Sequence, residues 1–228
     1  MLAAPRPAHT SDRGHSAPPI LLAGFEPFGG HPLNPSWLIA AALHRRQIAG
    51  HRVLAAQLPT VFGASLARLH ALLDQHRPAL VVCLGLAAGR SALSIERVAI
   101  NVNDARIPDN AGAQPVDTPV VAEAPAAYFS TLPIKAMRQA MADAGVPAEI
   151  SQTAGTFVCN HVFYGLMHRL ATGHGLAGAR GGFIHVPLLP EQGSPSLPLE
   201  TMVEGLRVGL RCALARRVDA RLVGGALD

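Results

Sequence analysis

This sequence of 228 residues has few of the basic and aromatic side chains that nucleic-acid-binding proteins combine. It contains a single lysine, Lys135, and aromatic residues make up 4% of the chain, which leaves few rings to stack on bases. The net charge of +4 comes from scattered arginines, without a basic run interleaved with aromatic residues. The composition therefore argues against a nucleic acid partner, in spite of a pI near 9.5.

Cysteine is rare, and long apolar runs are missing. The three cysteines, Cys83, Cys159 and Cys212, are widely spaced and odd in number, which is not the pattern of a disulfide framework. No run reaches the roughly 18 apolar residues of a membrane span, and the Pro-, His- and Ser-rich N-terminus lacks the apolar segment of a signal peptide. We therefore expect a cytoplasmic protein, with residues 1–18 as a disordered extension and residues 19–228 as one domain.

Apolar strand-like segments alternate with helical segments over the rest of the chain, in which 49% hydrophobic residues are enough for a sizeable core. The predicted strands are 19–25, 51–58, 79–85, 95–101, 147–153 and 181–187, and the predicted helices are 35–47, 61–76, 133–144, 157–172 and 198–217. Asn34 and Pro35 supply an N-cap and a proline at the first helical position. This alternation predicts an α/β fold, a single three-layer α/β/α sandwich with a largely parallel twisted central sheet.

The segment from Gln152 to His161 is the most informative part of the chain. It is typical of a strand that runs through a glycine turn into a helix, with Cys159 at the start of the helix. Backbone N–H groups at a helix N-terminus have no internal partner, and the helix dipole adds partial positive charge there. We therefore expect the pKa of the Cys159 thiol to lie below its ordinary value, and the N–H groups to stabilise an oxyanion. Free cysteines are also often buried, so a role in the core is the alternative.

Two other segments could supply the partners that a cysteine nucleophile needs, namely a histidine and a group that orients it. Residues 182–187 form an apolar strand-like run with His185 near its end, and residues 94–101 form another that carries Glu96. Taken singly, His185 could be a hydrogen-bonded core histidine, and Glu96 could be half of a surface ion pair with its neighbouring arginine. All three candidates stand at strand ends or at a helix start, where open α/β sheets place functional groups.

Four long blocks of motif residues stand out. They are GFEPFGG at 24–30 with NPSW at 34–37, ERVAIN at 96–101 with DARIPDN at 104–110, TAGTFVCNH at 153–161, and GFIHVPLLPEQ at 182–192. In this order they resemble the pyroglutamyl peptidase I family of cysteine peptidases, also called pyrrolidone-carboxylate peptidases. The resemblance runs from about Pro19 to Arg217, and four ordered blocks are far more specific than a single glycine motif.

The resemblance implies an activity and a set of site residues. Members of this family remove an N-terminal pyroglutamyl residue from peptides through a thiol acyl-enzyme, and neither a cofactor nor a metal is expected. The matching positions would give Cys159 as nucleophile, His185 as base and Glu96 as its orienting carboxylate. The pocket for the apolar pyrrolidone ring would be formed by Phe25, Phe28, Phe157 and Val158. A homo-oligomer, a dimer or tetramer, is also implied.

One loop departs from the family pattern. Many members have a glutamine in a Gly-Gln-Ala-Gly-Gly-Arg loop, where its amide can bond the lactam, but residues 85–90 here read GLAAGR. Because Leu86 cannot make that bond, we expect ring recognition to depend more on backbone groups and apolar packing. Arg90, in the same turn, is a candidate second donor to the oxyanion beside the Cys159 N–H. The Pro- and Asp-rich stretch from Asn103 to about Pro125 is predicted to cover the active site or contact a neighbouring subunit.

Other chemistries stay open from the sequence. The glycine-rich turns do not fit the dinucleotide or P-loop patterns, so a nucleoside phosphorylase-like enzyme rests on fold analogy alone. Cys159, His161, His168 and His174 are metal-ligand types, but those on the predicted helix do not share one face, and no paired metal motif is present. A peptide-binding homologue without catalysis is the third alternative. Cys83, in a buried-strand run, and Cys212, in a helical stretch, are expected to be inert.

Overall fold

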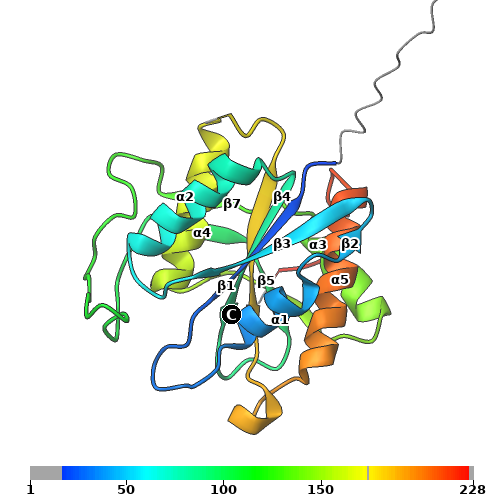
Figure 1. The fold of residues 1–228 in the computed structure, drawn as a ribbon, viewed down its shortest axis with the longest axis horizontal. Helices are drawn as coiled ribbons and strands as arrows, with labels where there is room; N and C mark the ends of the chain where they lie inside the picture. Colours follow the sequence, from blue (N-terminus) through cyan, green and yellow to red (C-terminus); the bar gives the residue numbers. More distant parts are fainter. Residues whose placement is uncertain (1–16, 174, 226–228) are drawn as a thin grey trace, which may run out of the picture.

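The structure is a computed structural model that describes residues 17–173 and 175–225, and its centre is a twisted seven-stranded sheet (Figure 1). The strand order is β2-β3-β1-β4-β9-β5-β8. Their bounds are β1 Ile20–Phe25, β2 Gln47–Ile48, β3 His51–Leu58, β4 Leu80–Leu86, β5 Leu93–Glu96, β8 Ala148–Ser151 and β9 Arg180–Val186. Strands β3, β1, β4 and β9 are parallel, whereas β5 and β8 run the other way and β2 is antiparallel to β3.

Helices cover both faces of this sheet. The helices are α1 Pro35–Leu43, α2 Ala64–His76, α3 Ile134–Asp143, α4 Val158–Ala171 and α5 Leu199–Ala215, with a short 3-10 helix at Pro190–Gln192. Helices α2 and α4 pack together on one face, and α1, α3 and α5 cover the other (Figure 1). Central strands therefore bury both faces, as in β4, where every residue is buried. The predicted α/β/α sandwich with a largely parallel sheet is confirmed.

Most predicted elements recur within one to three residues, and the N-cap is confirmed because the Asn34 side chain accepts the Ser36 N–H at 3.1 Å. The helix predicted at 35–47 was too long, since α1 ends at Leu43 and a short strand follows. The strand predicted at 95–101 was wrong as a single element. It divides at Arg97 into β5 and β6, Val98–Ile100, and β6 pairs with β7, Ala127–Phe129, in a separate two-stranded sheet.

The stretch from Asn103 to Pro125 forms an irregular loop held by polar contacts. The Asn101 side chain bonds the Val121 backbone at both its N–H and carbonyl, and a backbone bridge joins Asn103 to Thr118. This loop lies beside α2 and α4 in Figure 1. Of the predicted N-terminal extension at 1–18, all but Ala17 and Pro18 lie outside the described residues.

Candidate active site

Cys159 lies in the first turn of α4, directly over β4. The turn before the helix contains Gly155 at φ +74°, a left-handed conformation that favours glycine. A Cβ atom at Gly85 of β4 would come within 2.8 Å of Cys159 Sγ and within 2.8 Å of Phe183 Cζ. The missing side chain at Gly85 is therefore what lets the thiol approach the sheet so closely.

His185 lies on the strand next to Gly85. In the parallel pairing of β4 with β9, Gly85 is the register partner of His185, and neighbouring strands are about 4.8 Å apart. Phe183, two residues earlier on β9, points to the same face and packs in the cluster under α4. The imidazole and the thiol thus occupy neighbouring positions on one face of the sheet. No hydrogen bond joins these two side chains in the described part of the chain, and such contacts are often long before substrate binds.

Glu96 reaches His185 from the antiparallel neighbour of β9. Ser94 is the register partner of His185, so Glu96 is its diagonal neighbour on the same face. His185 Nδ1 lies 2.7 Å from Glu96 Oε1, and the Glu96 side chain is fully buried. A neutral imidazole that donates from Nδ1 to this carboxylate keeps Nε2 free as a base.

Arg90 completes the surroundings of Glu96. Its Nη1 donates to the same Oε1 atom at 2.9 Å, and its Nη2 donates to the Thr153 carbonyl at 3.3 Å. Burial lowers the pKa of His185 from its ordinary value, while the Glu96 hydrogen bond acts in the opposite direction. The histidine is therefore neutral at rest, and the cation in contact with Glu96 is Arg90.

The sequence-based expectation for the thiol pKa was wrong in direction. Burial, together with the smaller effect of the Glu96 charge, raises the pKa of Cys159 to about 12, although the charge of Arg90 acts the other way. Desolvation of a buried thiolate thus outweighs the helix dipole. The resting thiol keeps its proton, so a base would have to accept this proton for the sulfur to act as a nucleophile. The side chain is still partly exposed, so a substrate can reach it.

The backbone N–H groups of the first turn of α4 are available to an anion. The first N–H in this helix with a backbone acceptor is that of His161, which donates to the Phe157 carbonyl at 3.1 Å. The N-cap residue, Phe157, has no side-chain oxygen that could accept from the preceding donors. The donors of Val158, Cys159 and Asn160 have no acceptor among the residues described, as is expected at a helix start.

Several hydrogen bonds fasten the nucleophile segment to the segment after Glu96. Asn160, which is fully buried, accepts the Ile100 N–H at 3.0 Å and donates to the Ile100 and Val102 carbonyls at 2.9 Å each. The Asp104 N–H donates to the Thr156 carbonyl at 3.0 Å, and the Thr156 hydroxyl donates back to the Asp104 carbonyl at 2.6 Å. These contacts fix the start of α4 relative to β6 and the residues that follow it.

Three aromatic rings, those of Phe28, Phe62 and Phe157, form a wall beside the start of α4. The rings of Phe28 and Phe157 are 6.2 Å apart, and both are half-buried. Phe62 packs edge-on against Phe157 at 5.4 Å, a member of this wall that sequence reasoning missed because it lies outside the motif blocks. Phe25, 2% exposed, packs on Phe183 at 6.4 Å, and Val158 is fully buried. Of the four predicted ring-binding residues, Phe28 and Phe157 are therefore partly accessible, whereas Phe25 and Val158 belong to the buried core cluster.

Leu86 is the last residue of β4 and is 7% exposed. Side chains alternate along a strand, so Leu86 belongs to the opposite side of β4 from Gly85. A buried apolar side chain at this position offers no hydrogen bond to a ligand.

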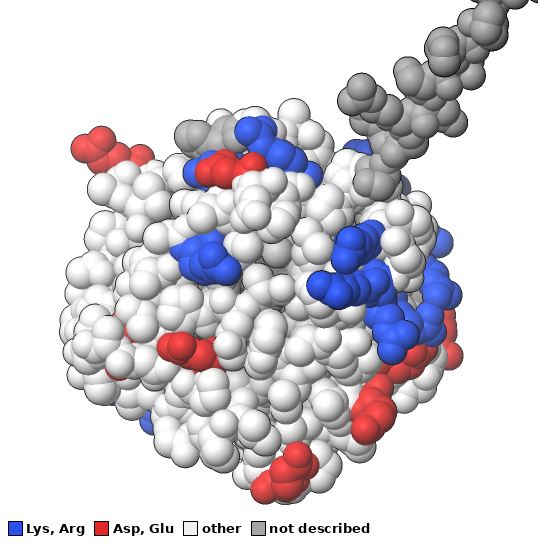
Figure 2. Space-filling model, viewed as in Figure 1, with Lys and Arg blue, Asp and Glu red and all other residues white. Residues whose placement is uncertain are grey.

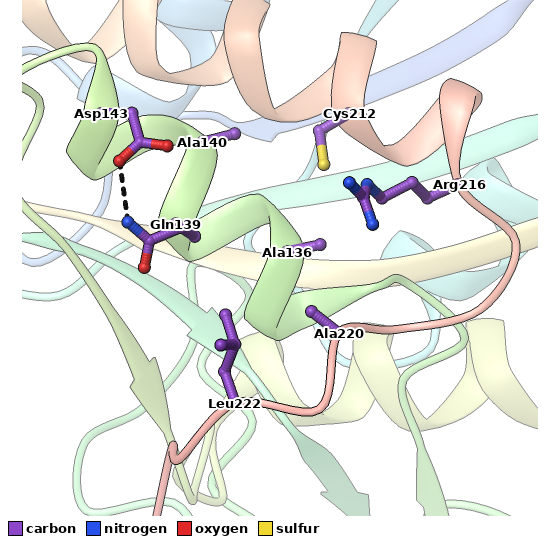
Figure 3. Close-up of a pocket in the computed structure, with 8 residues that line it drawn as sticks. All are labelled: Ala136, Gln139, Ala140, Asp143, Cys212, Arg216, Ala220 and Leu222. Atoms are coloured by element: carbon purple, nitrogen blue, oxygen red, sulfur yellow. Dashed lines mark hydrogen bonds between the residues drawn. The ribbon is translucent and has the colours of Figure 1, made fainter.

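The other two cysteines lack the groups that would make them nucleophiles. Cys83 is buried inside β4, and burial raises its pKa to about 12. Cys212 on α5 borders a hollow of about 200 Å³ between α3 and the C-terminal segment (Figure 3). Its pKa is also raised by burial, and no histidine lines this hollow. The cysteine–histidine arrangement found around Cys159 therefore has no counterpart among the residues that line this hollow.

Neither the distribution of charged side chains nor the placement of potential metal ligands indicates a second site. On the face seen in Figure 2, basic side chains gather on the side where β2 and β3 lie, and acidic side chains adjoin them. The described residues hold no group of three or more His, Cys, Asp or Glu side chains that could bind a metal ion. Within residues 17–173 and 175–225, no helix has the length and hydropathy to cross a membrane.

Comparison with known proteins gives consistent matches over nearly the whole chain. The family model described as pyroglutamyl peptidase matches residues 19–216. A pyrrolidone-carboxylate peptidase of Cupriavidus taiwanensis is 60% identical over 215 residues, which cover 92% of this chain and 99% of the relative. The crystal structure of pyroglutamyl peptidase I from Bacillus amyloliquefaciens aligns with a TM-score of 0.88 at 43% identity, covering 91% of this chain and 100% of that one. Pyrrolidone carboxyl peptidase from Pyrococcus furiosus aligns with a TM-score of 0.84 at 42% identity, covering 87% and 99%.

Proposed function

The chain belongs to the pyroglutamyl peptidase family, and from that premise we propose that Cys159, His185 and Glu96 carry out its hydrolysis of N-terminal pyroglutamyl residues. The resemblance seen in the four motif blocks is thereby confirmed at the level of family and activity. The residue assignment rests on two observations. Cys159 Sγ lies over Gly85, which is the register partner of His185, and His185 Nδ1 contacts Glu96.

The first half of the reaction forms an acyl-enzyme. His185 Nε2 takes the thiol proton of Cys159 as Sγ bonds to the pyroglutamyl carbonyl carbon. The resulting oxyanion accepts hydrogen bonds from backbone N–H groups at the start of α4, which have no other acceptor among the described residues. The carbon–nitrogen bond then breaks, and His185 gives its proton to the departing peptide amine. A thioester of pyroglutamate on Cys159 remains.

The second half returns the enzyme to its starting state. Water attacks the thioester carbonyl while His185 Nε2 accepts a proton from the water. The carbon–sulfur bond breaks, and the proton passes from His185 to the thiolate. Glu96 keeps the imidazole in one tautomer throughout and stabilises its positive charge in both halves.

We propose that apolar side chains make the enzyme selective for the pyroglutamyl ring. The pyroglutamyl ring is a neutral lactam, so it can be buried among Phe25, Phe28, Phe157 and Val158 without an unpaired charge. A free α-ammonium group would lose its hydration there and find no counter-charge, which costs several kcal/mol by general transfer arguments. Since Leu86 is apolar, the lactam N–H and carbonyl are proposed to bond backbone groups.

The experiment compares fluorogenic pyroglutamyl, prolyl and glutamyl amides as substrates, with and without a thiol alkylator. We expect selective cleavage of the pyroglutamyl amide that alkylation abolishes. Cys159→Ala should remove turnover, whereas the matched variant Cys212→Ala should keep it. Glu96→Gln should lower kcat by about 10³- to 10⁴-fold, as loss of an orienting carboxylate does in other triads.

Contrary outcomes of this experiment are informative. Turnover by folded Cys159→Ala would refute the nucleophile assignment, and an unchanged kcat in Glu96→Gln would refute the role of the carboxylate. No cleavage of any amide by folded wild-type protein would favour a peptide-binding homologue or a phosphorylase-like enzyme instead.

We further propose a cytoplasmic homo-oligomer, a dimer or tetramer. Support for the compartment comes from the catalytic thiol, which stays reduced where glutathione and thioredoxin act. Support for assembly comes from exposed apolar side chains, among them Phe129, 71% exposed, and Val116, 66% exposed. Light scattering coupled to gel filtration measures the mass, and a monomer at micromolar concentration would contradict the assembly.

A further inference from the structure

The carboxylate of Glu96 is held through one of its two oxygens. Oε1 accepts from both His185 Nδ1 at 2.7 Å and Arg90 Nη1 at 2.9 Å. The other oxygen, Oε2, is buried and has no hydrogen-bond partner among the described residues. Two donors from different segments thus converge on one atom, and their directions set the orientation of the carboxylate.

A fully buried carboxylate also needs a compensating charge. Removing one partner of a buried ion pair is costly because the other charge is left without compensation. The titratable or charged groups that face Glu96 are Arg90, His185 and Cys159. His185 and Cys159 are neutral at rest, so the compensation falls to the guanidinium, whose side chain is 25% exposed.

Arg90 also connects the elements that carry two of the three candidate catalytic residues, Glu96 and Cys159. It follows β4, which contacts the thiol through Gly85, and it bonds Glu96 at the end of β5. Its second amino group donates to the Thr153 carbonyl, in the turn that leads into the nucleophile helix. Two of the five N–H groups of Arg90 thus have acceptors, and both bonds hold the guanidinium between Glu96 and the turn before α4.

We propose that Arg90 is a positioning residue that balances the charge of the buried Glu96 carboxylate and turns its Oε1 toward His185, so that Nε2 stays free as the base. This inference rests on the proposed roles of Cys159, His185 and Glu96. It differs from oxyanion donation or substrate binding, because Arg90 acts through Glu96 and touches neither the reacting carbonyl nor the ring.

The test measures kcat and KM in Arg90→Ala and Arg90→Lys. It also measures how kcat/KM depends on pH, in particular the acid limb, where activity falls as His185 takes up a proton. In Arg90→Ala we expect kcat to fall by about 10²-fold, as for a catalytic group displaced by roughly 1 Å, with KM nearly unchanged. The charge of Arg90 lowers the pKa of His185, so its removal should move the acid limb to higher pH. Arg90→Lys retains the positive charge, so it should leave the limb in place while kcat falls through lost geometry.

Chemical rescue separates this role from a general loss of structure. Added guanidinium should restore part of kcat in Arg90→Ala, because it can occupy the vacated, partly exposed position beside Glu96. The same guanidinium should not rescue Glu96→Gln, which is the matched control. If Arg90→Ala does not fold, Arg90→Lys still tests the idea through the position of its acid limb.

Three results would overturn the proposal. One is an unchanged kcat and acid limb in Arg90→Ala, and another is a rise in KM at constant kcat, which would indicate substrate binding. The third is a fall in kcat with the acid limb unmoved and no guanidinium rescue, which would indicate oxyanion donation. Failure of the wild-type enzyme to cleave pyroglutamyl amides would instead refute the proposed function, so the two failures are distinguishable.

Discussion

Gly85 shows how one missing side chain shapes the site at the scale of single residues. The cysteine, histidine and carboxylate could be predicted from the sequence because their types and motif context carry chemical information. The need for Gly85 could not, since it arises only when α4 packs over β4 and brings Cys159 Sγ close to the strand. The contact of Arg90 with Glu96 was missed for the same reason, because it depends on the turn after β4.

Gly85→Ala should impair both catalysis and stability. The new methyl group would lie 2.8 Å from Cys159 Sγ and 2.8 Å from Phe183 Cζ, so the thiol or the ring must move. We expect kcat to fall by about 10²-fold, the usual effect of a 1 Å misplacement. The overpacking should cost about 1–3 kcal/mol of unfolding free energy. Steady-state kinetics and urea unfolding measure the two effects.

The matched control is Gly225→Ala, where a Cβ atom meets nothing within 4 Å. It should change neither kcat nor the unfolding free energy by a measurable amount. Full activity in Gly85→Ala would show that the thiol does not need its position against β4.

At the scale of secondary-structure elements, the sequence predicted strands and helices well but failed where tertiary pairing decides. The apolar run at 95–101 has the composition of one strand, yet Arg97 ends it because its N–H donates to Ser151 while its carbonyl accepts from Ser130. The chain then leaves the central sheet and β6 pairs with β7. Periodicity along the chain contains no information about this change of partner.

The Asn160 side chain bonds the backbone at the end of β6 as a neighbouring strand would. Its substitution should therefore loosen β6. In Asn160→Ala, the Ile100 N–H and the Ile100 and Val102 carbonyls would lose their hydrogen bonds in a partly buried place. Each fully buried unsatisfied group costs about 1–3 kcal/mol, and since these three groups are only part-buried we expect a total near the lower end, roughly 3 kcal/mol. Urea unfolding measures this loss, and hydrogen exchange should show faster exchange of the Ile100 amide.

Asn110→Ala serves as the comparison for Asn160→Ala. Asn110 also donates two side-chain hydrogen bonds, to Glu26 Oε1 and the Pro27 carbonyl, but in an exposed position where water can replace them. Its loss should therefore cost less than about 1 kcal/mol. Equal losses in the two variants would mean that Asn160 does not support β6 in the way its contacts suggest.

At the scale of the whole molecule, His161 joins three parts of the chain that are distant in sequence. On α4, its Nδ1 lies 2.9 Å from Asn103 Oδ1 in the long loop, and its Nε2 accepts the Gly63 N–H at 3.0 Å, just before α2. The ring is also packed edge-on against Phe62 of the aromatic wall. Burial, helped by the charge of His70, lowers the pKa of His161 to about 4.

This pKa makes the folded state sensitive to acid through a defined window. Above pH 6.5, His161 is neutral in both the folded and unfolded states, so it adds no pH dependence. Between about pH 6.5 and 4, the unfolded chain binds a proton that the folded chain excludes, so unfolding free energy falls as pH falls. A shift from 6.5 to about 4 corresponds to roughly 3 kcal/mol lost across this window. Burial of His185 acts in the same direction.

Urea unfolding of the wild type and of His161→Asn between pH 7 and 4 measures this contribution. The asparagine can still donate to Asn103 but cannot take up a proton. It should therefore start with a lower unfolding free energy and lose about 3 kcal/mol less over the window. His76→Gln, at the end of α2, should keep the full wild-type slope. If His161→Asn also kept that slope, the acid sensitivity would lie elsewhere, and His161 would not be the group that couples α4, α2 and the long loop to pH.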